Sequence, residues 1–463
     1  MQRYADQYLQ EWLVGSSRKP LLMRGARQVG KTWLVRNLAK NTQKQLIEIN
    51  FEKNPELYTA FKTNEPDIIL RAIELTMGLQ INIDQSILFL DEIQAFPNLI
   101  AKLRWFYESL PALPVIAAGS LLDFVLADHT FSMPVGRITY MHVNPFSFEE
   151  FLIVKKCENL VSFLKTCQLT TDVLSVIHER FMTLFREYLV VGGMPSAIAA
   201  WIETNSLQSV SLVHNELLLS YRDDFSKYAG KISTRYLEET MTAIPQLLGQ
   251  KFIYSHVNSD VKATLMKDAL NLLCKARVGY KIRAIPANGL PLLAGVDHKR
   301  FKVEFIDVGL ALSLLKLRLD QIESAGDINL INQGAISEQV VGQLLHCIEP
   351  AYIESHNYCW HREEKSSSAE IDYIIQHASQ IIPIEVKSGT TGSMKSLQLF
   401  MQLKKRKLAV RINSDVPSFV EVNVKSHDGQ AIQYQLLSIP FYLIEQLPRL
   451  LDAILSGARN VPK

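Results

Sequence analysis

The sequence predicts an α/β protein of about three domains, on the evidence of its length, its composition and two changes of pattern along the chain. Its 463 residues are 48% hydrophobic and 21% charged, which is typical of globular domains that bury their own cores. At roughly 150 residues per domain, this length corresponds to about three domains. We expect them to comprise residues 1–151, 152–330 and 331–463.

The first region alternates strand-like and helix-like segments. Short apolar runs predict strands at Pro20–Arg24, Leu46–Phe51, Ile87–Leu90 and Val115–Ala118. Helical patterns lie between them, at Lys31–Lys40 and Leu99–Leu110. Strands that alternate with helices predict a parallel sheet covered on both faces.

The second and third regions have different patterns. The second is mainly helical and ends in a helix candidate followed by two β-like runs, at Ala263–Ala276, Gly279–Ile285 and Arg300–Ile306. This order predicts a winged helix, whose basic residues between Lys262 and Arg283 either contact nucleic-acid phosphates or form a solvated helix face. The third region predicts a smaller α/β domain, with a helix at Gly334–Cys347 and strands at Tyr358–Arg362, Ile371–Ile375 and Ile381–Val386.

The composition excludes several classes of protein. The 49 basic and 47 acidic residues leave a formal charge of +2, so no strong field favours nucleic acid on composition alone. The five cysteines are scattered without a Cys-x-x-Cys pair, which indicates reduced thiols. The polar N-terminus lacks a signal-peptide core, and no apolar run approaches the roughly 18 residues that span a bilayer. We therefore expect a cytoplasmic protein without a membrane partner.

Residues 25–32, Gly-Ala-Arg-Gln-Val-Gly-Lys-Thr, fit the phosphate-binding pattern G-x-x-x-x-G-K-[ST]. The motif follows an apolar strand and opens a helix, as its mechanism requires. Backbone N–H groups and the helix N-terminus attract phosphate oxygens there. Lys31 should reach the β and γ phosphates of ATP, and the Thr32 hydroxyl should hold Mg²⁺. The expected nucleotide-binding residues are Gly25, Ala26, Arg27, Gln28, Val29, Gly30, Lys31, Thr32 and Trp33.

A pair of acids at the end of a second buried strand supports this site. Asp91 and Glu92 follow Ile87–Leu90, and the carboxyl end of a parallel strand faces the ligand crevice. Asp91 should complete the Mg²⁺ shell, and Glu92 should orient or deprotonate the attacking water. The alternative interpretation, a solvated strand end, is common for an isolated Asp-Glu pair.

Two further residues are candidates at the same site. Ser120 follows the strand Val115–Ala118, where a polar side chain can touch the water or the γ-phosphate. Arg137 could neutralise charge that develops on the phosphate, in cis or from a neighbouring subunit. The alternative for Arg137 is an ordinary surface arginine.

The third region carries a second set of acids. Glu385 and Lys387 lie two residues apart on a β-like run and therefore share one strand face. A short hairpin would set Asp372 beside Glu385, and Glu338 on the preceding helix could lean over the same point. Such a set of carboxylates suits a second Mg²⁺ or Mn²⁺, with Lys387 steadying the nucleophile or the developing charge. The alternative is a solvated strand face.

The motifs resemble those of a prokaryotic family of AAA+-type P-loop ATPases. The resemblance rests on the P-loop and on six further segments: Phe-Leu-Asp-Glu-Ile-Gln, Ala-Ala-Gly-Ser, Asn-Pro-Phe-Ser-Phe-Glu-Glu-Phe, Tyr-Leu-Val-Val-Gly-Gly-Met-Pro, Phe-Ile-Asp-Val-Gly-Leu-Ala and Ile-Glu-Val-Lys-Ser-Gly. Two positions depart from it, because Ala26 stands where the family often has Pro and Trp33 where a small hydroxyl residue is frequent. Neither departure removes a phosphate or metal ligand.

This resemblance implies an ATPase domain, a winged-helix-like middle and a C-terminal restriction-endonuclease-like domain of the PD-(D/E)XK type. Glu338, Asp372, Glu385 and Lys387 would occupy the four positions of that nuclease motif. The resulting hypothesis is a Mg²⁺-dependent ATP-hydrolysing protein associated with nucleic acid. The alternative is an ATP-gated interaction module whose C-terminal fold is a non-catalytic binding platform. The sequence leaves open whether the partner is DNA, another protein or a second copy of the chain.

Overall fold

The computed structural model describes residues 1–127, 132–169, 171, 173–228, 230, 232–317, 333–364, 367–389, 394–425 and 429–457. It divides into two compact units. The first contains Met1–Pro145, Lys275–Arg277 and Pro350–Glu354, and the second contains Phe146–Cys274, Val278–Glu349 and Ser355–Lys463. The expected boundary after residue 330 lies outside the described residues, and the described residues that flank it belong to the second unit.

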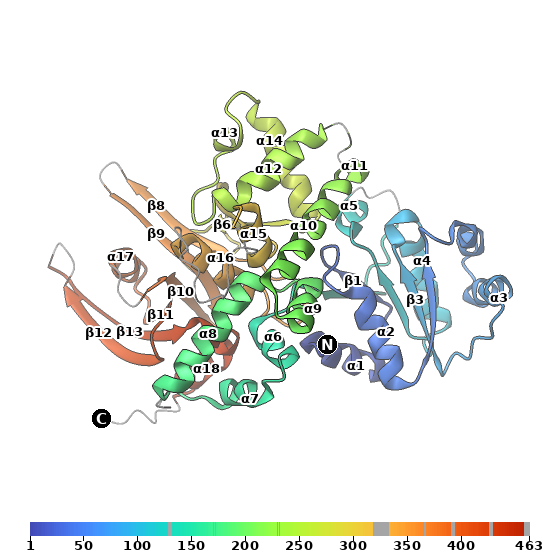
Figure 1. The fold of residues 1–463 in the computed structure, drawn as a ribbon, viewed down its shortest axis with the longest axis horizontal. Helices are drawn as coiled ribbons and strands as arrows, with labels where there is room; N and C mark the ends of the chain where they lie inside the picture. The colour runs from blue at the N-terminus through green and yellow to red at the C-terminus, as the bar shows by residue number, and fades with distance from the viewer. Residues whose placement is uncertain are drawn as a thin grey trace. The chain divides into compact units, whose positions relative to one another are not determined.

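The first unit is built on a five-stranded sheet with the strand order β2-β3-β4-β1-β5 (Figure 1). Its strands are β1 (Leu21–Arg24), β2 (Gln45–Asn50), β3 (Ser86–Asp91), β4 (Val115–Ala118) and β5 (Thr139–His142). Every neighbouring pair is parallel, which confirms the predicted parallel sheet. We did not expect β5, in which only Met141 is buried, because a single inward apolar residue leaves little periodic signal.

Helices connect the strands of the first unit. They are α1 (Tyr4–Val14), α2 (Lys31–Thr42), α3 (Pro66–Met77), α4 (Leu99–Ser109) and α5 (Leu122–Ala127), with short 3₁₀ turns at Pro55–Lys62 and Ile93–Ala95. All six residues of β3 are buried, as expected for a strand covered on both faces. One apolar cluster joins Leu88 and Leu90 of β3 to Ile69 of α3 and Leu103 of α4. This packing anchors the strand that ends in Asp91.

The second unit begins with a series of helices. They are α6 (Phe148–Val154), α7 (Glu158–Thr166), α8 (Ser175–Val191), α9 (Pro195–Thr204), α10 (Leu207–Asp223), α11 (Phe225–Tyr228), α12 (Thr234–Gln246), α13 (Tyr254–Val257), α14 (Ala263–Lys275) and α15 (Val308–Leu314). Later helices are α16 (Gln333–Leu345), α17 (Lys395–Lys404) and α18 (Leu447–Leu455), with a 3₁₀ turn at Phe441–Gln446. No described helix has both the length and the apolar character needed to cross a membrane.

The strands of the second unit form one eight-stranded sheet, in the order β12-β13-β11-β10-β9-β8-β6-β7 (Figure 1). They are β6 (Gly279–Ala284), β7 (Asp297–Phe305), β8 (Tyr358–Glu364), β9 (Ser367–His377), β10 (Gln380–Val386), β11 (Leu408–Asn413), β12 (Ser418–Lys425) and β13 (Ala431–Pro440). Trp360 of β8 packs edge-on against Phe400 of α17, with ring centroids 5.1 Å apart. This contact lies in the apolar cluster between α17 and the sheet.

The expected hairpin after α14 is present, because β6 pairs antiparallel with β7. However, β6 also pairs in parallel with β8, with Arg283 opposite Tyr358. The hairpin therefore extends the C-terminal sheet, and a separate winged helix is not shown. The sequence did not reveal this pairing because the two strands lie far apart in the chain.

A buried aspartate explains two of the sequence motifs. The Asp307 carboxylate accepts hydrogen bonds from the N–H groups of Gly193, at 2.6 Å, and Leu310, at 3.0 Å. It caps α15 and holds the Gly192-Gly193 turn at the same time. Gly192 has φ +73°, and a Cβ there would collide with this carboxylate. The turn therefore requires glycine at position 192.

Candidate active site

The loop between β1 and α2 has the backbone that its glycines predict. Gly30, the residue before α2, is left-handed with φ +96°. A Cβ at Gly25 would collide with the carbonyl oxygen of Val143. Both positions therefore require glycine, and the loop ends at the N-terminus of α2, where N–H groups face outward along the helix axis.

Lys31 is buried at the start of α2, with 8% of its surface exposed. Its Nζ donates hydrogen bonds to the carbonyl oxygens of Gly25, at 2.9 Å, and Ala26, at 2.7 Å. Burial lowers its pKa to about 8, although Glu92 and Asp91 act in the opposite direction. The ammonium is thus still mostly charged at neutral pH and is held against the loop.

The side chain of Thr32, on α2, is hydrogen-bonded to that of Asp91, at the end of β3. The Thr32 Oγ1 donates a hydrogen bond to Asp91 Oδ2 at 3.1 Å, and the Glu92 N–H donates to Asp91 Oδ1 at 3.0 Å. Burial, and then repulsion by Glu92, raise the pKa of Asp91 to about 6. A hydroxyl and a carboxylate side by side are oxygen donors of the kind that Mg²⁺ takes. The residues present therefore fit this ion.

Glu92 occupies a strained position directly after β3. Its φ is +53°, which is uncommon for a residue other than glycine. The Gln94 Nε2 donates a hydrogen bond to Glu92 Oε2, and a Cβ at Gly119 would collide with Gln94 Oε1. Gln94, which we had not singled out as a site residue, thus lies between Glu92 and the end of β4, where Ser120 is also buried.

The structure does not bring Arg137 to this edge of the sheet. Its Nε donates to Glu108 Oε1 at 2.9 Å near the end of α4, and its side chain is 42% exposed. Arg137 precedes β5, which runs parallel to β1. It therefore lies at the amino ends of the strands, whereas the P-loop follows their carboxyl ends. A role in cis does not fit this geometry, and the role in trans stays a prediction.

Four charged side chains form a closed ring in the first unit. Arg24 Nε lies 2.7 Å from Asp123 Oδ1, and Arg277 Nε lies 2.5 Å from Asp123 Oδ2. Glu354 pairs with both arginines, at 3.3 Å from Arg24 and 2.6 Å from Arg277. Two cations and two anions thus alternate around the ring.

The ring corrects one expectation about Arg277. Arg277 lies in the basic stretch between Lys262 and Arg283, for which the sequence left open phosphate contact or a solvated helix face, yet it is buried, with 7% of its surface exposed. Its charge also lowers the pKa of Lys31, so it lies within electrostatic range of the P-loop. The sequence could not show this, because Arg277 follows Lys31 by nearly 250 residues and no local pattern links the two.

The second unit brings together the four expected residues of the C-terminal set. They are the three acids Glu338, Asp372 and Glu385 and the lysine Lys387. The ladder between β9 and β10 places Ile384 opposite Tyr373, next to Glu385 and Asp372 in the two strands. Asp372 Oδ2 accepts a hydrogen bond from the Val386 N–H at 2.8 Å, and Lys387 Nζ lies 2.7 Å from Glu385 Oε1. Burial and the Asp372 charge raise the pKa values of Glu338 and Glu385.

The sequence pattern did not reveal two further charged residues of this set, Lys302 and Glu370. Lys302 of β7 pairs with Glu338 at 2.8 Å, with Glu370, and with Asp372 at 3.6 Å. The available signal was a lysine in the β-like run Phe301–Phe305, whose residues 301, 303 and 305 are apolar. Across the described residues, no group of three or more His, Cys, Asp or Glu side chains is arranged to hold a metal ion. The second metal site is therefore not shown.

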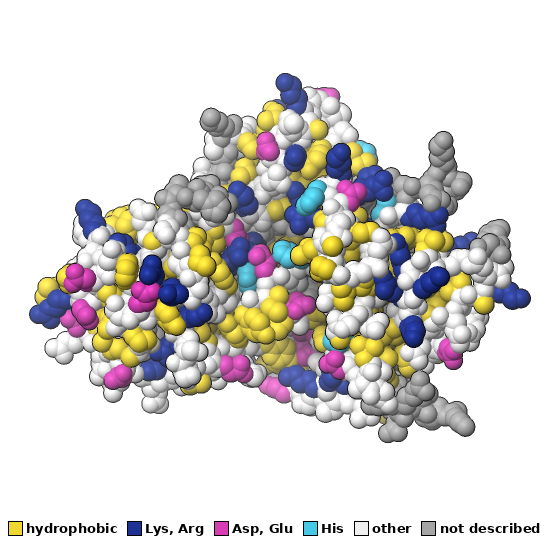
Figure 2. Space-filling model, turned by 180° about the vertical axis from the view of Figure 1, so that it is seen from behind, with side chains coloured by type: hydrophobic (Ala, Val, Ile, Leu, Met, Phe, Trp, Pro, Cys, Tyr) yellow, Lys and Arg dark blue, Asp and Glu magenta, His cyan; other side chains and the backbone are white. Residues whose placement is uncertain are grey.

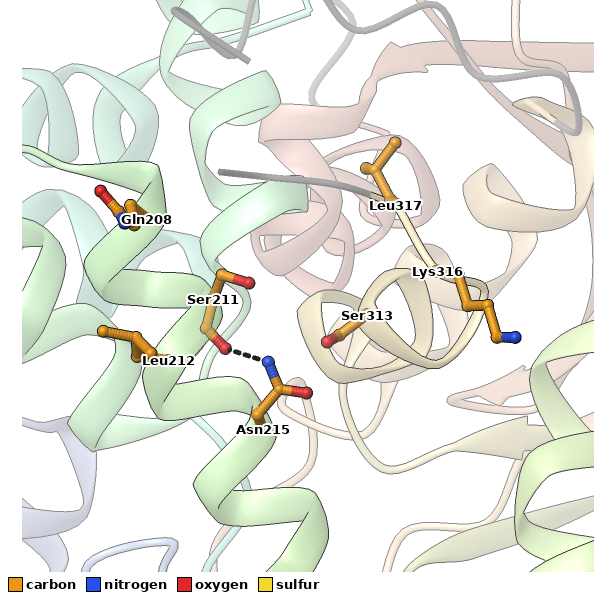
Figure 3. A pocket seen from close by; sticks show the side chains of 7 residues that line it. All are labelled: Gln208, Ser211, Leu212, Asn215, Ser313, Lys316 and Leu317. Atoms are coloured by element: carbon orange, nitrogen blue, oxygen red, sulfur yellow. Dashed lines mark hydrogen bonds between the residues drawn. The ribbon is translucent and has the colours of Figure 1, made fainter. Parts of the chain in front are cut away.

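A separate pocket of about 420 Å³ lies between α10 and the end of α15. Figure 3 shows its lining, with Ser211 and Asn215 on one side and Ser313 and Lys316 on the other. Gln208, Leu212 and Leu317 complete the lining, so Lys316 is the one ionisable side chain among these residues. The lining offers no acid–base pair, and we assign it no chemistry.

Comparison with known families gives three matches along the chain. Residues 17–152 match the profile of an AAA domain. Residues 182–321 and 333–437 match two domains of unknown function, DUF8612 and DUF4143. Together with the loop geometry, the first match supports an ATPase of the P-loop class. The C-terminal match does not establish the expected restriction-endonuclease-like fold, which stays a prediction.

Similar solved structures include a Walker-type ATPase of Pyrococcus abyssi, with a TM-score of 0.43, 17% identity, and coverage of 68% of this chain and 96% of that one. The ORC2 protein of Aeropyrum pernix has a TM-score of 0.33 and 14% identity, covering 67% and 90%. The RuvB Holliday junction branch migration motor of Thermotoga maritima has a TM-score of 0.28 and 14% identity, covering 61% and 90%. These scores are too low to carry an argument. No curated protein matches the chain.

The charged ring makes a prediction about stability. Asp123→Asn leaves the guanidinium groups of Arg24 and Arg277 with one shared anion, Glu354, so the free energy of unfolding of the first unit should fall by about 2–3 kcal/mol. Glu48→Gln is the control, because it breaks the exposed Arg36–Glu48 pair and should cost less than about 1 kcal/mol. Urea denaturation measures both changes. Equal effects of the two substitutions would contradict the importance of the ring.

Proposed function

We propose that this protein is a Mg²⁺-dependent ATP hydrolase that works in association with nucleic acid. The observation that carries the ATPase part is the convergence of Lys31, Thr32, Asp91 and Glu92 at the carboxyl edge of one parallel sheet. Ligands of α/β proteins bind at this edge. The four side chains supply the charges and oxygen atoms that phosphoryl transfer requires.

Each residue has a separate role in this proposal. Lys31 exchanges its two loop carbonyls for the β and γ phosphate oxygens of ATP. Thr32 and Asp91 would hold Mg²⁺, which when bound would offset the negative charge of the phosphates. Glu92 accepts a proton from the attacking water or orients that water. Gln94, through its hydrogen bond to Glu92, keeps the carboxylate in position.

The association with nucleic acid rests on the family resemblance of the sequence motifs, because the charge distribution of the chain does not favour it. The formal charge of +2 is nearly neutral, and on the face shown in Figure 2 basic and acidic side chains are interspersed. Lys281, a candidate for phosphate contact, points inward instead, since its Nζ donates to Asn271 and lies 5.1 Å from the ring centre of Phe301. Phosphate contact would depend on the more exposed Lys262 and Lys267 of the same stretch.

A second function, an ATP-gated protein-interaction module, is favoured by the C-terminal acids. One oxygen each of Glu338, Glu385 and Asp372 is paired, with Lys302, Lys387 and the Val386 N–H respectively. A C-terminal fold of this kind would act as a binding platform, and ATP hydrolysis would control access to it. The partner would then be a protein or a second copy of the chain.

Nucleotide affinity tests the role of Lys31. Lys31→Ala removes the charge that faces the β and γ phosphates, so the affinity for Mg-ATP should fall at least about 10-fold. Isothermal titration calorimetry measures the affinity directly. Lys40→Ala is the matched control, because it removes an exposed lysine from the same helix and should leave the affinity unchanged. Tight binding by the Lys31 variant would refute the assignment of the P-loop.

Turnover tests the role of Glu92. Glu92→Gln keeps the shape of the side chain but cannot accept a proton, so ATP should still bind and hydrolysis should slow by about 10²-fold or more. Phosphate release measures the rate, with the exposed Glu56→Gln as the control. A rate equal to that of the unmodified protein would assign Glu92 another role.

DNA binding separates the two proposed functions. For the first function, a fluorescent duplex should bind more tightly in the presence of ATP, and the affinity should fall steeply between 50 and 200 mM salt, by about 10-fold or more. Glu92→Gln keeps ATP bound during the anisotropy measurement. Absence of DNA binding at the lower salt, with ATP bound, would favour the interaction module.

A further inference from the structure

Lys302 lies at the centre of the C-terminal acidic set. Its side chain is only 5% exposed, although lysine is among the residues least often buried. Its Nζ pairs with Glu338 on α16 and with Glu370 and Asp372 on β9. One ammonium group thus joins three carboxylates from two elements, which is the connection that a bound cation would otherwise make.

The position of Lys302 on its strand keeps it there. The neighbouring residues Phe301 and Val303 are buried as well, so the strand is packed on both faces. Lys302 lies opposite Ile282 in the β6–β7 ladder. Withdrawing the ammonium into water would leave three carboxylates close together without a counter-ion, which is unfavourable for buried charges.

Two further carboxylate oxygens of the set also have partners within the chain. Asp372 Oδ2 accepts the Val386 N–H, and Glu385 Oε1 pairs with Lys387. The backbone of Gly249 lies near Glu338, because a Cβ added to that glycine would stand 3.2 Å from Glu338 Oε1. Glu385 Oε2 is a buried atom of this set that has no hydrogen bond. Lys302, Lys387 and the Val386 N–H already occupy oxygens of this set, which reduces the number available to the six-ligand shell of Mg²⁺.

The donor set therefore does not fit the divalent ion that the nuclease resemblance implies. We propose that Lys302 is a built-in counter-ion that takes the place of a divalent cation in the C-terminal domain, so that this domain neither binds such an ion nor cleaves phosphodiesters. The Lys302 ammonium holds the acidic residues of α16 and β9 together without a metal ion. This inference is independent of the ATPase site, because it concerns residues of the second unit alone.

The test counts Mn²⁺ ions bound to the full-length, nucleotide-free protein by electron paramagnetic resonance. Glu385→Gln should bind as many Mn²⁺ ions as the unmodified protein, since the set holds none. Lys302→Met has a similar volume but no charge, so it should bind one additional Mn²⁺. The double variant Lys302→Met/Glu385→Gln should lose that additional ion. Sites in the first unit are common to all four proteins and cancel in the comparison.

Thermal unfolding supplies the second readout. Mn²⁺ should raise the melting temperature of Lys302→Met by about 2–4 °C and should leave the unmodified protein unchanged. Lys302→Arg keeps the positive charge and should bind no additional ion.

The proposal is overturned if Glu385→Gln removes an Mn²⁺ ion from the otherwise unmodified protein, or if folded Lys302→Met gains none. Should Lys302→Met fail to fold, the comparison of the unmodified protein with Glu385→Gln still decides, because equal counts support the counter-ion and a lost ion refutes it. Cleavage of a DNA duplex by the unmodified protein in Mn²⁺, abolished by Lys387→Ala, would also refute it.

Discussion

The parallel pairing of β1, β3 and β4 is the constraint on which the candidate active site depends. Parallel strands end at the same edge of a sheet, so residues that follow them meet there even when they are remote in sequence. The P-loop follows β1, Asp91 and Glu92 end β3, and Ser120 follows β4. The hydrogen bond between Thr32 and Asp91 is the direct contact that results. The same rule places Arg137 at the opposite edge.

The backbone conformations of Gly25, Gly30 and Glu92 restrict the shape of the carboxyl edge of the first sheet. Gly25 lets the loop pass the Val143 carbonyl, and Gly30 turns the chain into α2. Glu92 adopts a left-handed conformation that costs on the order of 1 kcal/mol or more. In the proposed mechanism, this backbone conformation orients the Glu92 carboxylate toward the attacking water, and that orientation offsets the cost. Strain of this kind is typical of functional sites.

Buried charge is handled in two ways in this protein. In the first unit, Arg24, Asp123, Arg277 and Glu354 alternate in sign, so every charge in the ring has two opposite neighbours. In the second unit, one buried ammonium serves three carboxylates, and burial together with the Asp372 charge raises the pKa values of Glu338 and Glu385. The first arrangement stabilises its surroundings, and the second keeps an acidic set closed to other cations.

Local pattern was sufficient to predict the elements that form the candidate active site. The expected strand Val115–Ala118 agrees with β4 residue for residue, and Lys31–Lys40 lies within α2. The phosphate-binding motif and the acids after β3 could be recognised because each is a short run next to a strongly apolar strand. Prediction failed where the signal was weak, as in β5, or where a strand found its partner far along the chain, as β6 does with β8.

What the sequence by itself determined is therefore the parallel α/β character of the first unit and the residues at its carboxyl edge, because periodicity and short motifs encode both. Only the tertiary structure decided that Arg277 belongs to an ion ring in the first unit and that Lys302 occupies the centre of the C-terminal acids. Both are buried cations whose partners come from distant segments. Long-range ion pairing of this kind leaves no periodic trace in the sequence, since it depends on how the elements pack and not on the residues that flank each charge.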